Sequence, residues 1–124
     1  MRVFKSKIFS RFAKGEKISD KSLLEAVDRA MKGLIDADLG GGVIKQRIAR
    51  PGQGKSCGYR SIVLFRAGDK AFFVYGFAKN ERDNITPAER EAFKELAADM
   101  LSYSDEILRI TVKQGALLEV LDNE

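Results

Sequence analysis

The side chains that could carry out chemistry in this 124-residue chain are mainly those of lysine and arginine, because the sequence has no histidine and only one cysteine. The lack of histidine excludes Ser-His-Asp and Cys-His nucleophile pairs, and it excludes nearly all zinc sites. Cys57 has no histidine to activate it and no second cysteine for an internal disulfide, so it is interpreted as structural. Any catalysis must therefore use Lys, Arg, Tyr, Asp, Glu or Cys57.

Charge is unevenly distributed along the chain, although the formal net charge is only +4. Residues 41–82 contain 9 basic and 2 acidic side chains, whereas residues 83–124 contain 4 basic and 10 acidic ones. A basic segment of this kind is typical of a surface that binds a polyanion. The alternative is that Arg47, Arg60 and Arg66 are exposed strand cations that discourage edge pairing.

The cations of this basic segment are spaced so that a β-sheet would gather them on one surface. Lys45 and Arg47 are two residues apart, the repeat that places side chains on one face of a strand. An antiparallel meander would bring Arg60 near the end of the following strand. Cations hold phosphates and aromatic rings stack on bases, so such a surface suits RNA. The predicted RNA-facing residues are Lys45, Arg47, Arg50, Lys55, Arg60, Tyr75, Phe77, Lys79 and Arg82.

RNA cleavage without histidine requires cations to perform three tasks. The 2′-hydroxyl must lose a proton, the leaving 5′-oxygen must gain one, and the pentavalent phosphorane must be stabilised. A lysine crowded by other cations has a lowered pKa and can act as the base, while an arginine can hold the phosphate bidentately. A lysine base activates the 2′-hydroxyl only weakly. We therefore expect a partner that orients the substrate for attack.

The fragment Gly54-Lys55-Ser56 is similar to the end of a phosphate-binding P-loop, but the motif is incomplete. Ala49 stands where the motif requires its first glycine, and a predicted strand follows where the motif requires a helix. The P-loop interpretation is therefore rejected.

The elements that must position these side chains follow an α+β order. A short strand at 3–6 and a helix around 8–12 come first, followed by a helix that begins at Ser19 and ends near Gly33. Glycines 40–42 then stop regular structure. Three strands follow at hairpin spacing, 43–48, 59–65 and 70–77, with a Gly-rich loop at 51–58 and a turn at 66–69.

The C-terminal third is predicted to be helical with one added strand. Thr86, Pro87 and Glu89 form a capping-box sequence that starts a helix. Ser104 starts a second helix, and the apolar run 116–121 is predicted to be an edge strand. The predicted buried face of the first of these helices consists of Phe93, Leu96, Ala97, Met100 and Leu101, and the predicted core residues of the tail are Ile107, Leu108, Leu117, Leu118 and Val120.

The sequence gives no sign of a membrane segment or a secretory signal. No stretch approaches 18 consecutive apolar residues, and charges interrupt the apolar residues of the N-terminal segment. We therefore expect a cytoplasmic protein without a membrane partner.

Three sequence blocks resemble the RelE/HigB group of toxins from type II toxin–antitoxin systems, in the RelE/ParE superfamily. They are LIDADLGGGVIKQR at 34–47, RPGQGKSCGYRSIV at 50–63 and FVYGFAKNERDNIT at 73–86. The resemblance covers roughly residues 3–101. It implies a microbial-ribonuclease-like fold with two N-terminal helices, an antiparallel meander and a C-terminal helix in a domain at 1–101. Residues 102–124 are predicted to add a helix and strand packed on that domain.

The resemblance also implies a function and partners. The protein would be an mRNA interferase, a ribosome-dependent endoribonuclease that inhibits translation by 2′-hydroxyl attack without a metal or other cofactor. A cognate antitoxin, usually encoded beside the toxin, would neutralise it. By motif position, Arg60 is the expected phosphate-stabilising residue, with Lys55 and Lys79 as further catalytic residues. Lys45 and Arg47 would lie along the path of the RNA.

Two other functions are compatible with the same scaffold. One is a ParE-like toxin that inhibits DNA gyrase, and the other is a non-catalytic RNA-binding module. We expect the antitoxin to lay an amphipathic or extended segment across the basic surface. The acidic tail 105–124 could instead fold back over that surface, although its apolar residues favour a place in the core.

Overall fold

The computed structural model describes residues 1–50 and 54–121, and for residues 50 and 54–57 it describes the backbone only. The expected loop residues 51–53 and the last three residues of the predicted tail lie outside the described part. The elements of the described chain are β1 (Arg2–Ser6), α1 (Lys7–Gly15), α2 (Asp20–Met31), β2 (Ala37–Gly40), β3 (Val43–Arg50), β4 (Gly54–Arg66), β5 (Lys70–Ala78), α3 (Pro87–Met100), α4 (Asp105–Lys113) and β6 (Leu117–Glu119).

Each of these helices begins at a hydroxyl side chain that accepts a hydrogen bond from a backbone N–H of the first turn. Ser6 caps α1, Ser19 caps α2, and Ser104 caps α4. Thr86 caps α3 in a complete capping box, in which Glu89 bonds back to the Thr86 N–H. The caps satisfy donors that a helix terminus leaves unpaired, so the predicted helix starts at Ser19, Thr86 and Ser104 are confirmed.

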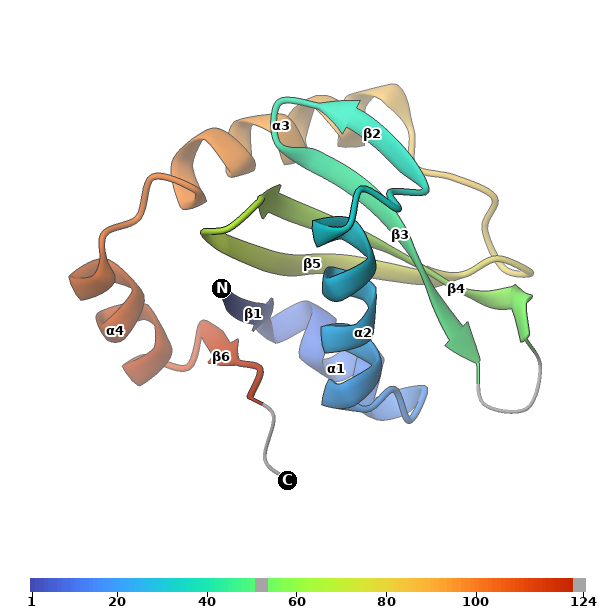
Figure 1. Cartoon of the computed structure of the whole chain (residues 1–124), viewed down its shortest axis with the longest axis horizontal. Helices are drawn as coiled ribbons and strands as arrows, with labels where there is room; N and C mark the ends of the chain where they lie inside the picture. The colour runs from blue at the N-terminus through green and yellow to red at the C-terminus, as the bar shows by residue number, and fades with distance from the viewer. Residues whose placement is uncertain (51–53, 122–124) are drawn as a thin grey trace.

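The strands form one mixed sheet in the order β2-β3-β4-β5-β1-β6. β2 to β5 are an antiparallel meander, as predicted from their short connections. β1 pairs parallel with β5, and β6 pairs antiparallel with β1, so the two ends of the chain extend the sheet on the side opposite β2 (Figure 1). The α+β fold class is confirmed, with a sheet that is mixed rather than wholly antiparallel.

Helices cover both faces of the sheet and create two cores. On the α1/α2 face, Phe9 and Leu23 pack with Tyr59 and Phe73. On the α3/α4 face, residues of those helices pack on the other side of the same strands. The described core residues of the α3/α4 face are Phe4, Val43, Ile62, Leu64, Phe72, Val74, Phe77, Ile85, Ala97, Met100, Leu101, Leu108 and Leu117.

A β-bulge in β5 changes which residues face α3. Val63 of β4 pairs with Phe73, whereas the preceding Ile62 pairs with Tyr75, so Val74 is the additional residue. Phe73 therefore lies in the α1/α2 core, while Tyr75 and Phe77 lie on the α3/α4 face. Regular alternation would have placed all three aromatic residues on one face.

The sequence analysis missed β2. Residues 37–40 form a four-residue strand that pairs with β3, although the adjacent glycines indicated an end of regular structure. Gly40, Gly41 and Gly42 have positive φ values of 87°, 62° and 83°, so they form the tight connection between two strands rather than a long loop. β2 makes β3 an interior strand.

One strand boundary and four predicted apolar positions differ from expectation. β4 starts at Gly54, so residues 54–58 of the predicted loop are strand. The predicted core residues Leu96, Ile107 and Leu118 are exposed, at 37%, 45% and 38%. Leu34, which continues the apolar spacing of α2, lies beyond the end of that helix and is 61% exposed. Each apolar side chain follows the predicted period but lies at the margin of a packed face.

Gly76 is required by close packing, because a Cβ atom at this position would lie 2.5 Å from a ring carbon of Phe12 and 3.0 Å from one of Phe9. We expect Gly76→Ala to destabilise the fold by roughly 1–3 kcal/mol through overpacking. Gly15→Ala, which has no atom within 4 Å of the added carbon, is the control and should be neutral or stabilising. Urea denaturation of both variants tests this, and equal stabilities would contradict the packing.

Candidate nucleic-acid interface

Four cations converge on the α3/α4 face near the end of β5, and we call Lys45, Arg47, Arg60 and Arg90 the basic cluster. Arg47 of β3 is the direct cross-strand partner of Arg60 of β4, and Lys45 lies opposite Ile62. Alternation places Lys45 and Arg47 on the same face as the buried Val43. Arg90 extends from the first turns of α3 and is close enough to lower the pKa of Lys45.

Arg60 is the most deeply placed member of the basic cluster. It is only 7% exposed, and its Nη1 is 3.5 Å from the carbonyl oxygen of Tyr59. Burial and the charge of Arg47 lower the pKa of Arg60, while Asp36 acts in the opposite direction. β4 is an interior strand, so protection of a sheet edge does not explain this buried cation.

Lys45 has the environment of a lysine that loses its proton more readily than usual. Burial is the largest cause of its lowered pKa, followed by repulsion from Arg60 and Arg90. Its Nζ is 3.4 Å from Oδ1 of Asn84, which also accepts the N–H of Ile85. The side chain is therefore held by a neutral amide, and no carboxylate of the described residues forms an ion pair with it.

Arg47 lies at the solvent side of the basic cluster and is held by Asp36. Its Nε is 3.5 Å from Oδ1 of Asp36, and its backbone N–H donates to Oδ2 at 2.6 Å. The Asp36 N–H donates in turn to Gln46, whose buried amide is bonded to the Ala26 carbonyl oxygen. The Arg47 side chain keeps 45% of its surface exposed, so it remains accessible to a ligand.

Arg82 is neutralised by an internal partner rather than left free. It forms a two-armed ion pair with Glu89 and donates to the Tyr75 hydroxyl at 2.8 Å. The ion pair raises the pKa of Arg82, and it is the largest cause that lowers the pKa of Glu89 to about 2. The Arg82 guanidinium also lies 5.6 Å from the ring centroid of Tyr75 and 5.9 Å from that of Phe77. This network fastens the segment after β5 to the first turn of α3.

The predicted role of Phe77 as a stacking platform for RNA bases is not supported. Phe77 is 5% exposed and packs in the α3/α4 core, with its ring centroid 5.9 Å from that of Tyr75. Tyr75 is half-buried between Phe77 and Phe93. The two rings therefore support Arg82 and α3 from beneath.

The remaining predicted site residues are not part of the basic cluster. Lys79 is exposed, and its backbone N–H is 3.5 Å from the Gly58 carbonyl oxygen, next to the start of the Arg60 segment. The backbone of Arg50 pairs with Gly54, and Lys55 lies in β4, but both side chains fall outside the described part. The structure thus brings Lys45, Arg47 and Arg60 together and leaves the two loop cations unassigned.

The acidic tail does not fold over the basic cluster within the described residues. Leu108, Leu117 and Val120 are buried, and three strands, β4, β5 and β1, lie between β3 and β6 (Figure 1). The apolar residues of the tail therefore act as core.

Three functional neighbours were missed by the sequence analysis: Asp36, Asn84 and Arg90. They come from the turn before β2, the segment before α3 and α3 itself, so their proximity to β3 depends on the tertiary fold. The capping box predicted where α3 begins, but not which strand its first turns approach. In the part of the chain that the structure describes, no group of three Cys, Asp or Glu side chains is arranged to hold a metal ion.

Together, the mixed sheet and the basic cluster define a small α+β protein with several cations gathered on one face of the sheet. The family model described as RelE toxin of the RelE/RelB toxin–antitoxin system matches residues 1–120. The chain therefore belongs to the RelE toxin family, as its sequence blocks indicated, and this family implies a cognate antitoxin. No curated protein matches the chain. No helix among the described residues is long and apolar enough to cross a membrane.

The Arg82–Glu89 ion pair should make stability depend on pH. Above the ordinary carboxyl pKa of 4.5, Glu89 is charged in both the folded and unfolded chain, and its contribution is complete. As pH falls toward about 2, the unfolded chain takes up the proton first, so the contribution is lost. We expect Glu89→Gln to be less stable than wild type at pH 7, with the difference vanishing near pH 2. Urea denaturation measures this.

Glu91→Gln on the same helix is the matched control, since Glu91 pairs only with Lys94. A stability difference for Glu89→Gln that stays constant between pH 7 and pH 2 would refute the assignment of the low pKa.

Proposed function

We propose that this protein is a ribosome-dependent endoribonuclease that cleaves mRNA in the cytoplasm and so inhibits translation. The observation that carries the proposal is that a buried arginine, Arg60, and a lysine of lowered pKa, Lys45, lie on the same face of adjacent strands, close enough for their charges to repel. Membership of the RelE family supports the same activity. The cleavage itself and its dependence on the ribosome are the parts that experiment must establish.

The proposed reaction divides three tasks among the cations. Lys45 in its neutral form removes the proton of the 2′-hydroxyl, which then attacks the adjacent phosphorus. Arg60 and Arg47 stabilise the additional negative charge on the phosphorane oxygens. The 5′-oxygen leaves with a proton from Lys79 or water, which gives a 2′,3′-cyclic phosphate and a 5′-hydroxyl. The exposed position of Lys79 near the Arg60 segment supports its place in this set.

The roles proposed for three further cations, Arg82, Lys55 and Arg50, rest on different grounds. Arg82 is committed to Glu89, so it is proposed to position α3 rather than to bind phosphate. On the strength of the family motif, Lys55 is retained as a proposed catalytic residue and Arg50 as a proposed RNA contact. The ribosome is proposed to orient the 2′-hydroxyl in line with the scissile bond, because proximity and orientation supply what a lysine base lacks.

Arg60→Ala should lower mRNA cleavage by about 10²–10³-fold, because one preorganised charge on the phosphorane is lost. Primer extension on mRNA in a translating bacterial extract measures new 5′ ends at ribosome-occupied codons. Arg109→Ala is the control, since Arg109 of α4 forms only a surface pair with Glu106. Undiminished cleavage by a folded Arg60→Ala protein would rule out the assigned site. Intact mRNA with DNA damage in cells that express wild type would favour gyrase inhibition instead.

The pH dependence of cleavage should report Lys45, because only its neutral form accepts a proton. Arg90→Gln removes a like charge that lowers the Lys45 pKa, so the rising limb of the rate profile should move to higher pH. Lys45→Arg keeps the charge but removes the base, and we expect a loss of roughly 10²–10⁴-fold. Single-turnover rates on ribosome-bound mRNA give both values. An unshifted profile in Arg90→Gln, with Arg109→Gln as control, would exclude Lys45 as the base.

A further inference from the structure

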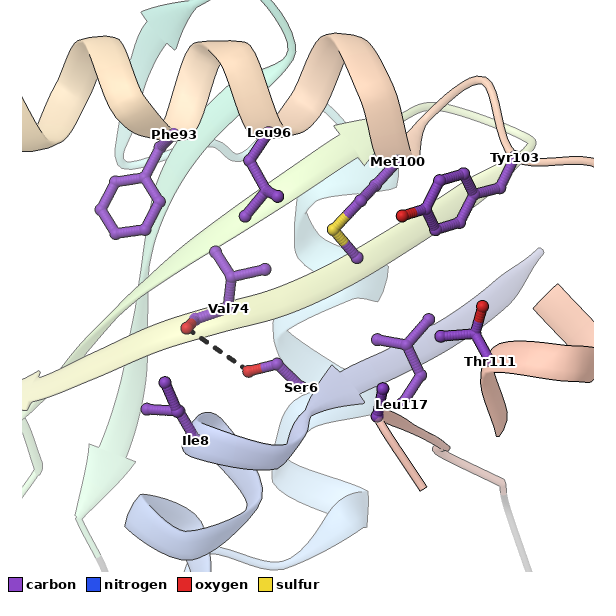
Figure 2. Close-up of a pocket in the computed structure, with 10 residues that line it drawn as sticks. Ser6, Ile8, Val74, Phe93, Leu96, Met100, Tyr103, Thr111 and Leu117 are labelled. Atoms are coloured by element: carbon purple, nitrogen blue, oxygen red, sulfur yellow. Dashed lines mark hydrogen bonds between the residues drawn. The ribbon is translucent and has the colours of Figure 1, made fainter. Parts of the chain in front are cut away.

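A second surface, away from the basic cluster, combines an apolar cavity with a row of cations. The cavity has a volume of about 370 Å³ and lies between α3, β5 and the junctions of β1 with α1 and of α4 with β6. Figure 2 shows Phe93, Leu96 and Met100 pointing from α3 toward Val74 and Leu117. An engineered cavity of roughly 150 Å³ admits benzene, so this one has room for more than one apolar side chain.

The polar atoms around the cavity already have partners within the protein. The Ser6 hydroxyl donates to the Val74 carbonyl oxygen at 3.4 Å and caps α1 (Figure 2). The Tyr103 hydroxyl is 3.3 Å from Asp99, and the Thr111 hydroxyl donates to the Ile107 carbonyl oxygen at 2.6 Å. The polar groups that line the cavity therefore need no hydrogen bond from a ligand, and the rest of the wall is apolar. An apolar ligand is favoured for this reason.

Large apolar side chains at the rim of the cavity are exposed to water, and this exposure does not stabilise the folded monomer. Ile8 is 66% exposed at the start of α1, and Leu96 is 37% exposed on α3. Both line the cavity from opposite sides. An apolar rim around an apolar cavity is the signature of a protein contact rather than of scattered surface residues.

A row of cations runs beside this rim along α1. Lys7, Arg11 and Lys14 are spaced on one helical face and line a shallow groove with Leu118 of β6. None of the three has a carboxylate within ion-pair distance among the described residues, whereas the neighbouring Arg2 and Lys5 do. Lys7 also stands in the first turn of α1, where the helix dipole disfavours a cation.

The groove and the cavity adjoin where α1 and β6 begin, but they lie on opposite faces of the sheet edge that β1 and β6 form. Lys7 lines the groove and Ile8 lines the cavity, and on β6 the consecutive residues Leu118 and Leu117 line the groove and the cavity respectively. The Lys7 N–H is 3.3 Å from the Ala116 carbonyl oxygen, so the starts of α1 and β6 are joined at this edge. Because β6 is the last strand of the sheet, a ligand segment that passes around this edge can contact both.

We propose that this surface is a docking site for the antitoxin, through a segment that inserts apolar side chains into the cavity and sets carboxylates over Lys7, Arg11 and Lys14. The charge of the row selects an acidic segment, and the apolar cavity selects a polypeptide with large side chains rather than a nucleic acid. The proposal rests on membership of a toxin–antitoxin family and does not depend on RNA cleavage. It places antitoxin contact on α1 and α3, in addition to or instead of the basic cluster.

The test measures binding of the protein encoded beside this chain, by isothermal titration calorimetry with purified components. Ile8→Glu should weaken binding at least tenfold, since a charge at the rim opposes burial of an apolar side chain. Leu34→Glu is the matched control, because Leu34 is 61% exposed and lines neither the cavity nor the groove. It should change affinity less than threefold.

A second comparison tests the cations of α1, with two double variants that have the same change in net charge. Lys7→Glu with Arg11→Glu should weaken binding at least tenfold, whereas Lys21→Glu in α2 with Lys32→Glu at the C-cap of α2 should not. Both Ile8→Glu and the Lys7/Arg11 variant should retain mRNA cleavage if that function holds, so the two proposals can fail separately. Circular dichroism and thermal melting confirm that each variant is folded.

Four outcomes would overturn the docking site. The first is no binding of the wild-type chain, and the second is equal loss in test and control variants. The third is loss of binding only in Arg47→Glu with Arg60→Glu, which would move the antitoxin to the basic cluster. Loss of binding of an apolar dye in Ile8→Glu with unchanged antitoxin affinity would likewise show that the cavity serves a small ligand instead.

Discussion

The face that carries the basic cluster depends on the β-bulge at Val74, because that single additional residue decides which aromatic rings lie beneath α3. With the bulge, Tyr75 and Phe77 share a face with Arg60 and support the Arg82–Glu89 ion pair, which fastens α3 in place. The bulge also turns Gly76 toward Phe12, where no larger residue fits. Since α3 supplies Arg90 to the basic cluster, the electrostatics of the site follow from a local irregularity in one strand.

The sequence was sufficient for those parts of the fold that depend on local rules. Helix starts at Ser19, Thr86 and Ser104 follow from side-chain capping, and the meander follows from short connections between apolar strands. The two-residue spacing of Lys45 and Arg47 was likewise enough to place both on one face. The nearness of Arg60 to the end of the following strand was predicted from the meander alone, and it is confirmed by the register, in which Arg60 lies opposite Phe77 of β5.

The parts that escaped prediction depend on relations between distant segments. A bulge has no reliable sequence signal, so alternation gave no indication that Phe73 and Tyr75 separate onto opposite faces. The four-residue strand β2 has a weak pattern next to glycines, and it forms because β3 offers an edge to pair with. The burial of Phe77 beneath Arg82 likewise required the placement of α3. In each case tertiary packing selected among structures that the local sequence allowed.

The basic cluster is costly to the folded protein, and this cost is informative. Arg47 and Arg60 face each other across adjacent strands, an arrangement that is destabilising for like charges. Arg60 is buried, and no carboxylate of the described residues forms an ion pair with it. Asp36 offsets part of this repulsion, through its ion pair with Arg47 at the solvent side of the basic cluster. Several other cations of the described chain have carboxylate partners, as in Arg2 with Glu119 and Arg82 with Glu89. In the basic cluster, Lys45, Arg60 and Arg90 instead repel one another, and a bound anion such as a phosphate would relieve this repulsion. In the free protein the same repulsion adds to burial, the larger cause, in lowering the pKa of Lys45. The charge arrangement that weakens the free protein is therefore also the one that an anion would stabilise.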